Sequence, residues 1–166
     1  MGGRLLPTAA FAALLVCGCD RLPERGVESP GITVLAEKRR TAADTARVGD
    51  TFGRPEEDGI HVSLRTDPKS REGHYFFVQL AFDPPAGSSL VVQVVRKEGV
   101  PAERHAFPLT RRPSAPLGEY AVGLTGAQAG PDGWRPIAWR ISVADQSGKV
   151  LAARHSFLWG TPDDLR

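Results

Sequence analysis

Cysteine is scarce in this sequence: two are present in 166 residues, Cys17 and Cys19, both near the amino terminus. A C-x-C pair with no further cysteine and no nearby histidine lacks the ligands that a tetrahedral metal site needs, which argues against a metal or redox role. The chain after Cys19 has no thiol and can form no disulfide within itself. Its stability must therefore come from packing and hydrogen bonds.

The chain also lacks a long apolar run and a cluster of positive charge. The apolar stretch Leu5–Val16 follows MGGR and has about twelve residues, whereas a helix that spans a bilayer needs roughly 20. This length is typical of the central region of a signal peptide. Lys and Arg number 21 against 19 Asp and Glu, they are scattered, and the net charge is +2, so no nucleic-acid partner is predicted.

The end of the apolar stretch, V-C-G-C at residues 16–19, resembles the bacterial lipobox. In that resemblance Gly18 is the small residue before the cleavage point and Cys19 receives the lipid, whereas Cys17 follows the branched Val16 and is removed with the signal. The resemblance implies that residues 1–18 are a signal peptide. It further implies a protein of the bacterial cell envelope, attached to membrane lipid through Cys19, with the leaflet left open. Ordinary secretory cleavage and an uncleaved anchor are the alternatives.

Residues 19–58 are rich in charge, proline and glycine, and we expect them to form a lipidated tether. Within this stretch ITVLAEKRRTAADTARV, residues 32–48, could be a marginal helix or could hold a short strand at Ile32–Ala36, and propensity does not decide between them; RVGDTF at 47–52 could pair with the domain as an edge strand. Residues 59–160 form the predicted single domain, and residues 161–166 a short tail. The expected domain is large enough to bury one core.

Alternation of apolar and polar residues after residue 59 predicts seven or eight short β-strands. Residues 76, 78, 80 and 82 are expected on one buried face, and the strand after them, near residues 88–99, is expected as a hairpin partner in the same sheet. Pro108 places the strand at 103–109 on a sheet edge. A second hairpin turns at D-Q-S-G, and its inward residues are predicted to be Ile137, Trp139, Ile141 and Val143, then Leu151, Ala153, His155, Phe157 and Trp159.

This pattern, without a strong helix, predicts an all-β fold with one antiparallel β-sandwich; a closed barrel is the alternative. The stretch LGEYAVGL resembles a strand entry of immunoglobulin-like and fibronectin type III-like domains. The resemblance implies that Tyr120 forms a tyrosine corner, with its hydroxyl bonded to nearby backbone. There is no Cys–Trp–Cys pattern of an antibody-type domain.

The sequence offers no catalytic, metal or cofactor site. His61, His74, His105 and His155 stand in no ligand spacing, and Ser88 and Ser89 lie in a predicted turn without the G-x-S-x-G motif. Trp134 and Arg135 lie in a Gly-Pro loop, where the indole either caps the core or stacks on a partner.

We therefore expect a non-enzymatic binding or structural module on a membrane anchor, with a protein partner in the envelope whose identity the sequence does not give. An accessory subunit or inhibitor of a secreted enzyme or envelope machine, acting through residues 126–135, is a second reading. A hydrolytic enzyme is the third.

Overall fold

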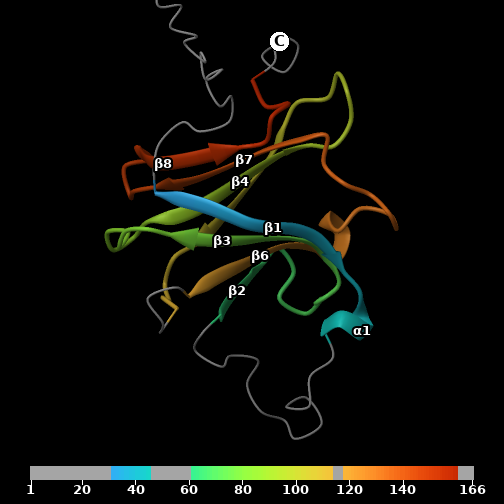
Figure 1. Ribbon diagram of the computed structural model, residues 1–166, viewed down its shortest axis with the longest axis horizontal. Helices are drawn as coiled ribbons and strands as arrows, with labels where there is room; N and C mark the ends of the chain where they lie inside the picture. Colours follow the sequence, from blue (N-terminus) through green and yellow to red (C-terminus); the bar gives the residue numbers. More distant parts are fainter. Residues whose placement is uncertain (1–30, 46–60, 114–117, 161–166) are drawn as a thin grey trace, which may run out of the picture.

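A computed structural model describes residues 31–45, 61–113 and 118–160, which form two four-stranded sheets packed face to face (Figure 1). The first sheet contains, in order, β1 (Ile32–Arg40), β3 (Gly73–Leu80), β6 (Glu119–Thr125) and β2 (His61–Arg65). The second contains β5 (Glu103–Pro108), β4 (Ser89–Val95), β7 (Ala138–Ala144) and β8 (Val150–His155). The helical elements described are the short α1 (Ala42–Thr45) and η1 (Gly126–Gln128). The predicted β-sandwich is confirmed.

The connectivity is immunoglobulin-like. β1, β3 and β6 lie side by side as strands A, B and E do in such domains, and β4, β7 and β8 as strands C, F and G do. Every described strand pair is antiparallel except β2 with β6, which run parallel from His61 opposite Glu119 to Arg65 opposite Gly123. The extra strand β2 thus extends the first sheet beyond β6.

The segment Ile32–Arg40, for which helix and strand were both open, is an edge strand. It pairs antiparallel with β3 from Ile32 opposite Leu80 to Arg40 opposite Gly73, with a register shift between Val34 and Ala36. Any tether on the amino-terminal side of the domain therefore ends by Gly31. Gly18, Cys19 and the signal segment 1–18 lie outside the described residues, as do 46–60 and 161–166. None of the helices in the described part of the chain could cross a membrane.

The predicted hairpin of β3 with β4 is wrong, because the two strands belong to opposite sheets. The connection at residues 81–88 crosses between the sheets, and it contains two prolines that cannot donate a backbone hydrogen bond. The alternation of each strand was interpreted correctly, since Phe76 and Val78 face Leu90 and other residues of β4 within one core. Alternation shows that one face is buried but does not show which strand lies beside it.

The core fills the space between the sheets. Its most deeply buried large residues are Phe76, Val78, Leu90, Val92, Val94, Val122, Leu124, Ile141 and Val143. Tyr120 is also buried, and its hydroxyl donates a hydrogen bond to the carbonyl oxygen of Arg111, nine residues upstream, at 3.3 Å. This is the kind of bond that the tyrosine-corner resemblance implied. Burial, only partly offset by Arg112, raises the pKa of the Tyr120 phenol.

The hairpin of β7 and β8 is confirmed, and Leu151 packs against the core as predicted, but the predicted face of β8 is wrong after Leu151. A register shift between Val143 and Ala144 places Ala152 opposite Val143, inside the core, while Ala153 lies on the other face. A one-residue bulge moves every following side chain to the opposite face of the sheet. Phe157, also expected to point inward, lies beyond the end of β8 in the turn at 157–160 and is 71% exposed. Ile137, expected as an inward strand residue, precedes β7 and is also exposed.

Candidate functional site

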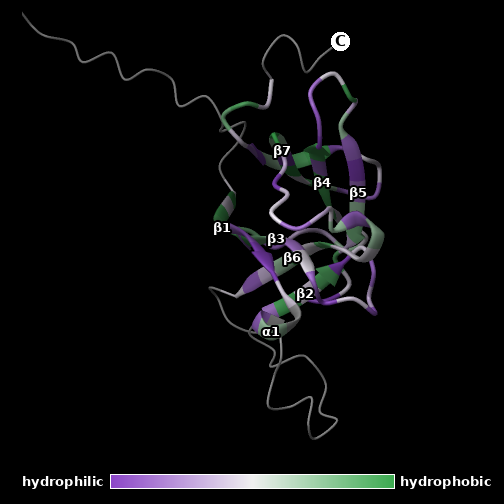
Figure 2. Ribbon diagram, turned by 90° about the vertical axis from the view of Figure 1, so that its right-hand side faces the viewer, coloured by the Kyte–Doolittle hydropathy of each residue, from purple (hydrophilic) through white to green (hydrophobic). Residues whose placement is uncertain are grey.

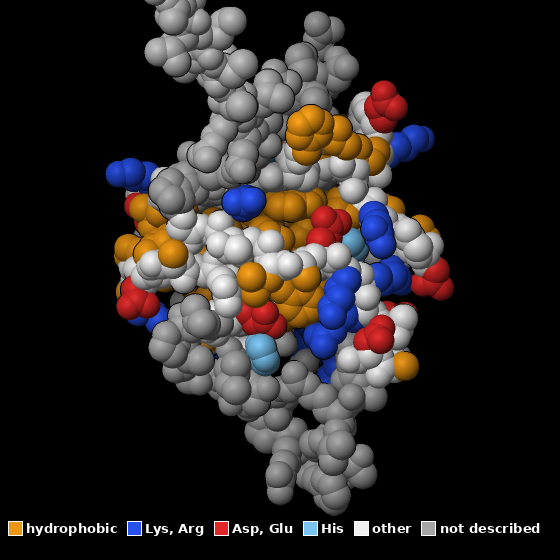
Figure 3. Space-filling view, in the orientation of Figure 1, with side chains coloured by type: hydrophobic (Ala, Val, Ile, Leu, Met, Phe, Trp, Pro, Cys, Tyr) orange, Lys and Arg blue, Asp and Glu red, His pale blue; other side chains and the backbone are white. Residues whose placement is uncertain are grey.

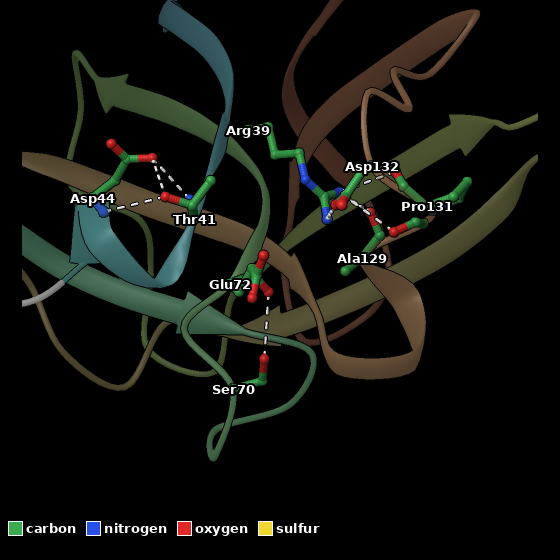
Figure 4. Close-up of polar contacts among 9 residues, drawn as sticks. Arg39, Thr41, Asp44, Ser70, Glu72, Ala129, Pro131 and Asp132 are labelled. Atoms are coloured by element: carbon green, nitrogen blue, oxygen red, sulfur yellow. Dashed lines mark hydrogen bonds and ion pairs between the residues drawn. The ribbon is translucent and has the colours of Figure 1, made fainter.

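The loop between β6 and β7 is held on the sandwich by Arg39 of β1. The Arg39 guanidinium donates to the carbonyl oxygens of Ala129, Gly130 and Pro131 at 3.2 to 3.3 Å, and it forms an ion pair with Asp132 at 2.8 Å. Figure 4 shows the Arg39 side chain pointing into this turn. Because one planar cation binds three successive carbonyls, the backbone of the loop is fixed to the first sheet. We name residues 126–135 the cap loop.

Trp134 folds back under the cap loop. Its indole lies edge-on to the His74 ring, with ring centroids 5.5 Å apart, and the Arg96 guanidinium stacks 4.3 Å from the centroid of the indole. Gly130 has φ +71°, and a Cβ atom there would lie 2.7 Å from the indole, so the turn requires glycine. Trp134 is half-buried and packs against the core. The indole thus forms part of the core cap, and the partner-binding role stays a prediction.

Arg96 ties the cap loop to the second sheet as well. Its guanidinium donates to the carbonyl oxygen of Gln128 at 2.7 Å and pairs with the Glu103 carboxylate at 2.8 Å. Burial alone would raise the pKa of Glu103, but the hydrogen bond and charge of Arg96, with His105, outweigh it, and the pKa of this carboxyl is lowered. The cap loop is thus held from both sheets by two arginines.

Glu37 lies at the centre of the site and joins the two sheets. Its Oε1 is 3.0 Å from Nε2 of His74 on β3, and its Oε2 accepts a hydrogen bond of 2.7 Å from Nε1 of Trp139 on β7. Phe76 lies edge-on to both the His74 and the Trp139 rings. Each carboxylate oxygen therefore has one directional partner, one from each sheet.

The electrostatics of the pair favour an ionised carboxylate. Burial alone would raise the pKa of Glu37, but the hydrogen bonds from His74 and Trp139 and the charges of His74 and Arg135 outweigh it, so the pKa is lowered. His74 Nδ1 is buried and has no hydrogen-bond partner in the described parts of the chain. A proton is therefore assigned to Nε2, which donates it to Glu37.

The exposure of this pair limits its chemistry. The His74 side chain is 1% exposed, whereas Glu37 keeps 28% of its side-chain surface accessible. A general base must reach the proton that it removes, and this imidazole faces Phe76 and Trp134 instead of solvent. The arrangement is suited to holding β1 and the cap loop in place, with Arg135 exposed beside it.

The remaining residues considered from the sequence do not gather at this site. His61 pairs with Glu119 at 3.0 Å, and His155 Nδ1 lies 2.9 Å from the carbonyl oxygen of Ser156. Ser88 is buried in the segment that directly precedes β4. The described residues contain no group of three or more His, Cys, Asp and Glu that could hold a metal. A separate open hollow of about 590 Å³ at the other end of the sandwich is lined by Gly31, Ala81, Phe82, Asp83, Pro85 and Leu151.

Sequence reasoning missed Glu37, Arg39 and Arg96. A signal for the first two existed, because charged residues two apart on one face of a strand are unusual beside a core. This signal applies only to a strand, and the sequence did not decide between helix and strand for the segment. The register shift at Val34 and Ala36 also changes the face on which later residues lie.

No family model, no curated protein and no solved structure matches this chain.

Proposed function

We propose that this protein is a membrane-anchored lipoprotein of the bacterial envelope whose sandwich serves as a non-enzymatic binding module. The anchor is supported by the apolar segment and the V-C-G-C stretch that ends at Cys19. The binding role is supported by the cap loop, whose backbone is fixed by Arg39 and Arg96. A loop already held in one conformation loses little conformational entropy when it binds a partner.

The partner contacts the exposed side of the cap loop. Asp132 has 95% of its side-chain surface accessible. Arg135, which directly follows Trp134, is also exposed. Trp134 supports this surface from below and is not itself the contact. The enclosed imidazole of His74 supports a binding role over a catalytic one, since this histidine, paired with Glu37, faces other aromatic rings and not solvent.

Site-specific photo-crosslinking in membranes tests the binding surface. A photoreactive amino acid at Arg135 should give a discrete protein adduct, whereas the same group at Arg104 should not. Arg104 is a matched control because it is also an exposed arginine but lies on edge strand β5 of the second sheet. Equal adducts at both positions, or adducts at Arg104 alone, would refute the assignment of the cap loop. An adduct with an enzyme or an envelope machine would make the protein its accessory subunit or inhibitor.

Fatty-acid labelling of growing cells tests the anchor. Because Gly18 is the small residue that precedes a thiol, incorporation should vanish in Cys19→Ser and persist in Cys17→Ala. Labelling that depends on Cys17 instead would show that the cleavage point is misplaced.

A further inference from the structure

Exposed apolar side chains gather at one end of the second sheet. Among the described residues six large hydrophobic side chains are exposed, and four of these are Val100, Ile137, Phe157 and Leu158. Val100 follows β4, Ile137 precedes β7, and Phe157 and Leu158 follow β8. Since these strands are antiparallel neighbours in the order β4-β7-β8, all four residues lie at the same end of the sheet.

Backbone hydrogen bonds fix the neighbours at this end. Ile137 donates to the carbonyl oxygen of Val95 at 2.9 Å, and Ser156 donates to that of Trp139 at 2.9 Å. In Figures 1 and 2 the turn at 97–101 and the turn at 157–160 both project beyond the strands, toward the top of each view. Figure 3 shows hydrophobic side chains at the upper right, where these turns lie. We name the two turns together the apolar end.

We propose that the apolar end rests on the lipid bilayer to which Cys19 is attached, an inference that depends on the proposed lipid anchor. The chain from Cys19 to Gly31 spans about 40 Å when fully extended and about 20 Å as a flexible coil. A domain on so short a connection stays beside the membrane. β1 begins at the opposite end of the sandwich, but a strand of seven residues such as β7 is only about 23 Å long, so the apolar end can reach the same surface.

The composition of the apolar end suits an interface with lipid. Phe157 and Leu158 are apolar, Trp159 beside them is half-buried, and on the other turn Lys97 and Glu98 are both exposed and add no net charge. Aromatic side chains favour the boundary between water and hydrocarbon. The other two exposed large side chains, Leu35 and Val150, stand singly on β1 and at the start of β8, which is ordinary for a protein surface.

The small area of the apolar end favours contact with a bilayer over contact with a second copy of the chain. A stable protein interface buries about 800 Å² on each partner, far more than two narrow turns present. A contact with lipid can be much weaker, because the anchor keeps the domain at a high local concentration near the membrane.

Fluorophore labelling of the lipidated full chain tests this contact. A nitrobenzoxadiazole group is attached to Val100→Cys or Phe157→Cys, with Val150→Cys and Leu35→Cys as controls, in vesicles of phosphatidylethanolamine and phosphatidylglycerol. Val100 and Val150 are matched in type and exposure, at 47% and 45%. We expect a blue-shifted emission and loss of intensity with nitroxide-bearing lipids at positions 100 and 157, and neither at 150 and 35.

Three results would overturn the proposal. Equal emission at all four positions would show that the apolar end stays in water. A blue shift at 100 and 157 without quenching by nitroxide lipids would indicate contact with protein, including a second copy. Stronger quenching at 150 would place the opposite end of the sandwich on the bilayer.

Fatty-acid incorporation measured on the same samples separates the two proposals. Incorporation at Cys19 together with equal emission at all positions would refute the membrane contact and leave the anchor intact. Failure of incorporation in the parent chain would refute the anchor and, with it, the argument for the contact.

Discussion

The two faces of β1 are held by different kinds of interaction. On the inner face Glu37 and Arg39 make directional contacts with His74, Trp139 and the cap loop. On the outer face Lys38 and Arg40 lie over aromatic rings, with the Lys38 ammonium 5.1 Å from the Phe77 centroid and the Arg40 guanidinium 5.5 Å from those of Tyr75 and Phe77.

The difference shows which face determines the position of the strand. A hydrogen bond to a charged group depends on angle and fails when its partner moves, whereas a cation over a ring tolerates sliding along the aromatic surface. The inner contacts therefore fix the register of β1 against both sheets, and the outer contacts add attraction with little positional demand. Removing side chains from each face in turn should reveal this asymmetry.

The largest effect is expected for His74→Ala. The substitution leaves a cavity beside Phe76 and removes a partner of the Glu37 carboxylate, so the free energy of unfolding should fall by about 3 kcal/mol. Urea unfolding of the full chain measures it. His155→Ala, on the outer face of β8, is the control and should cost about 1 kcal/mol or less. Equal losses in the two variants would show that the inner contacts of β1 have no special role.

A direct comparison of the faces uses Arg39→Ala and Arg40→Ala. Arg39→Ala should lower the free energy of unfolding by about 2 kcal/mol, because hydrogen bonds from a half-buried cation to the cap loop are lost. Arg40→Ala should cost about 0.5 to 1 kcal/mol, the value of a cation over a ring. Hydrogen exchange should also become faster in the cap loop of the first variant only. The reverse order of stability would contradict the asymmetry.

Acid titration tests how much the ionised Glu37 carboxylate contributes to the free energy of unfolding. Its pKa is lowered in the folded chain, so the stabilisation is complete above the ordinary value near 4.5 and is lost as the pH falls below it toward the folded value. The stability difference between the parent chain and Glu37→Gln should therefore shrink between pH 5 and the acid limit of folding. A difference that stays constant over this range, measured by urea unfolding at each pH, would show that the carboxylate charge does not matter.

The smallest effect is expected for Lys38→Ala. The Lys38 ammonium is exposed and approaches one ring, so its removal should cost about 0.5 kcal/mol at most. Thermal unfolding at low and high salt checks this, and little change with salt is expected. A loss as large as that of Arg39→Ala would mean that the outer face also fixes the strand.

The sequence predicted the sandwich because alternation is a local property. Phe76, Val78, Ile141 and Val143 were all expected inside, and all are buried. The pairing of strands was not predictable in the same way: β3 and β4 are joined by a turn-like segment yet lie in opposite sheets. Bulges were also not predictable, and one of them places Ala152 in the core where Ala153 was expected.

The site was predicted less well than the fold. Trp134 was recognised as a residue of interest with two possible roles, and its neighbours explain the one that it takes. Glu37 and Arg96 were missed because their partners are distant in sequence, with Glu37 bonded to a tryptophan 102 positions away. No pattern within one segment reveals contacts of that kind.

The four edge strands of the two sheets affect how the protein behaves when many copies lie close together. β1 has a register shift and inward charges, β2 has only five residues, β5 ends at Pro108, and β8 pairs through a bulge. Features of this kind disfavour the addition of a strand from another chain by backbone hydrogen bonding. If many copies share one membrane, their diffusion is confined to two dimensions and encounters are frequent. Resistance to aggregation is then a property of the edge strands themselves.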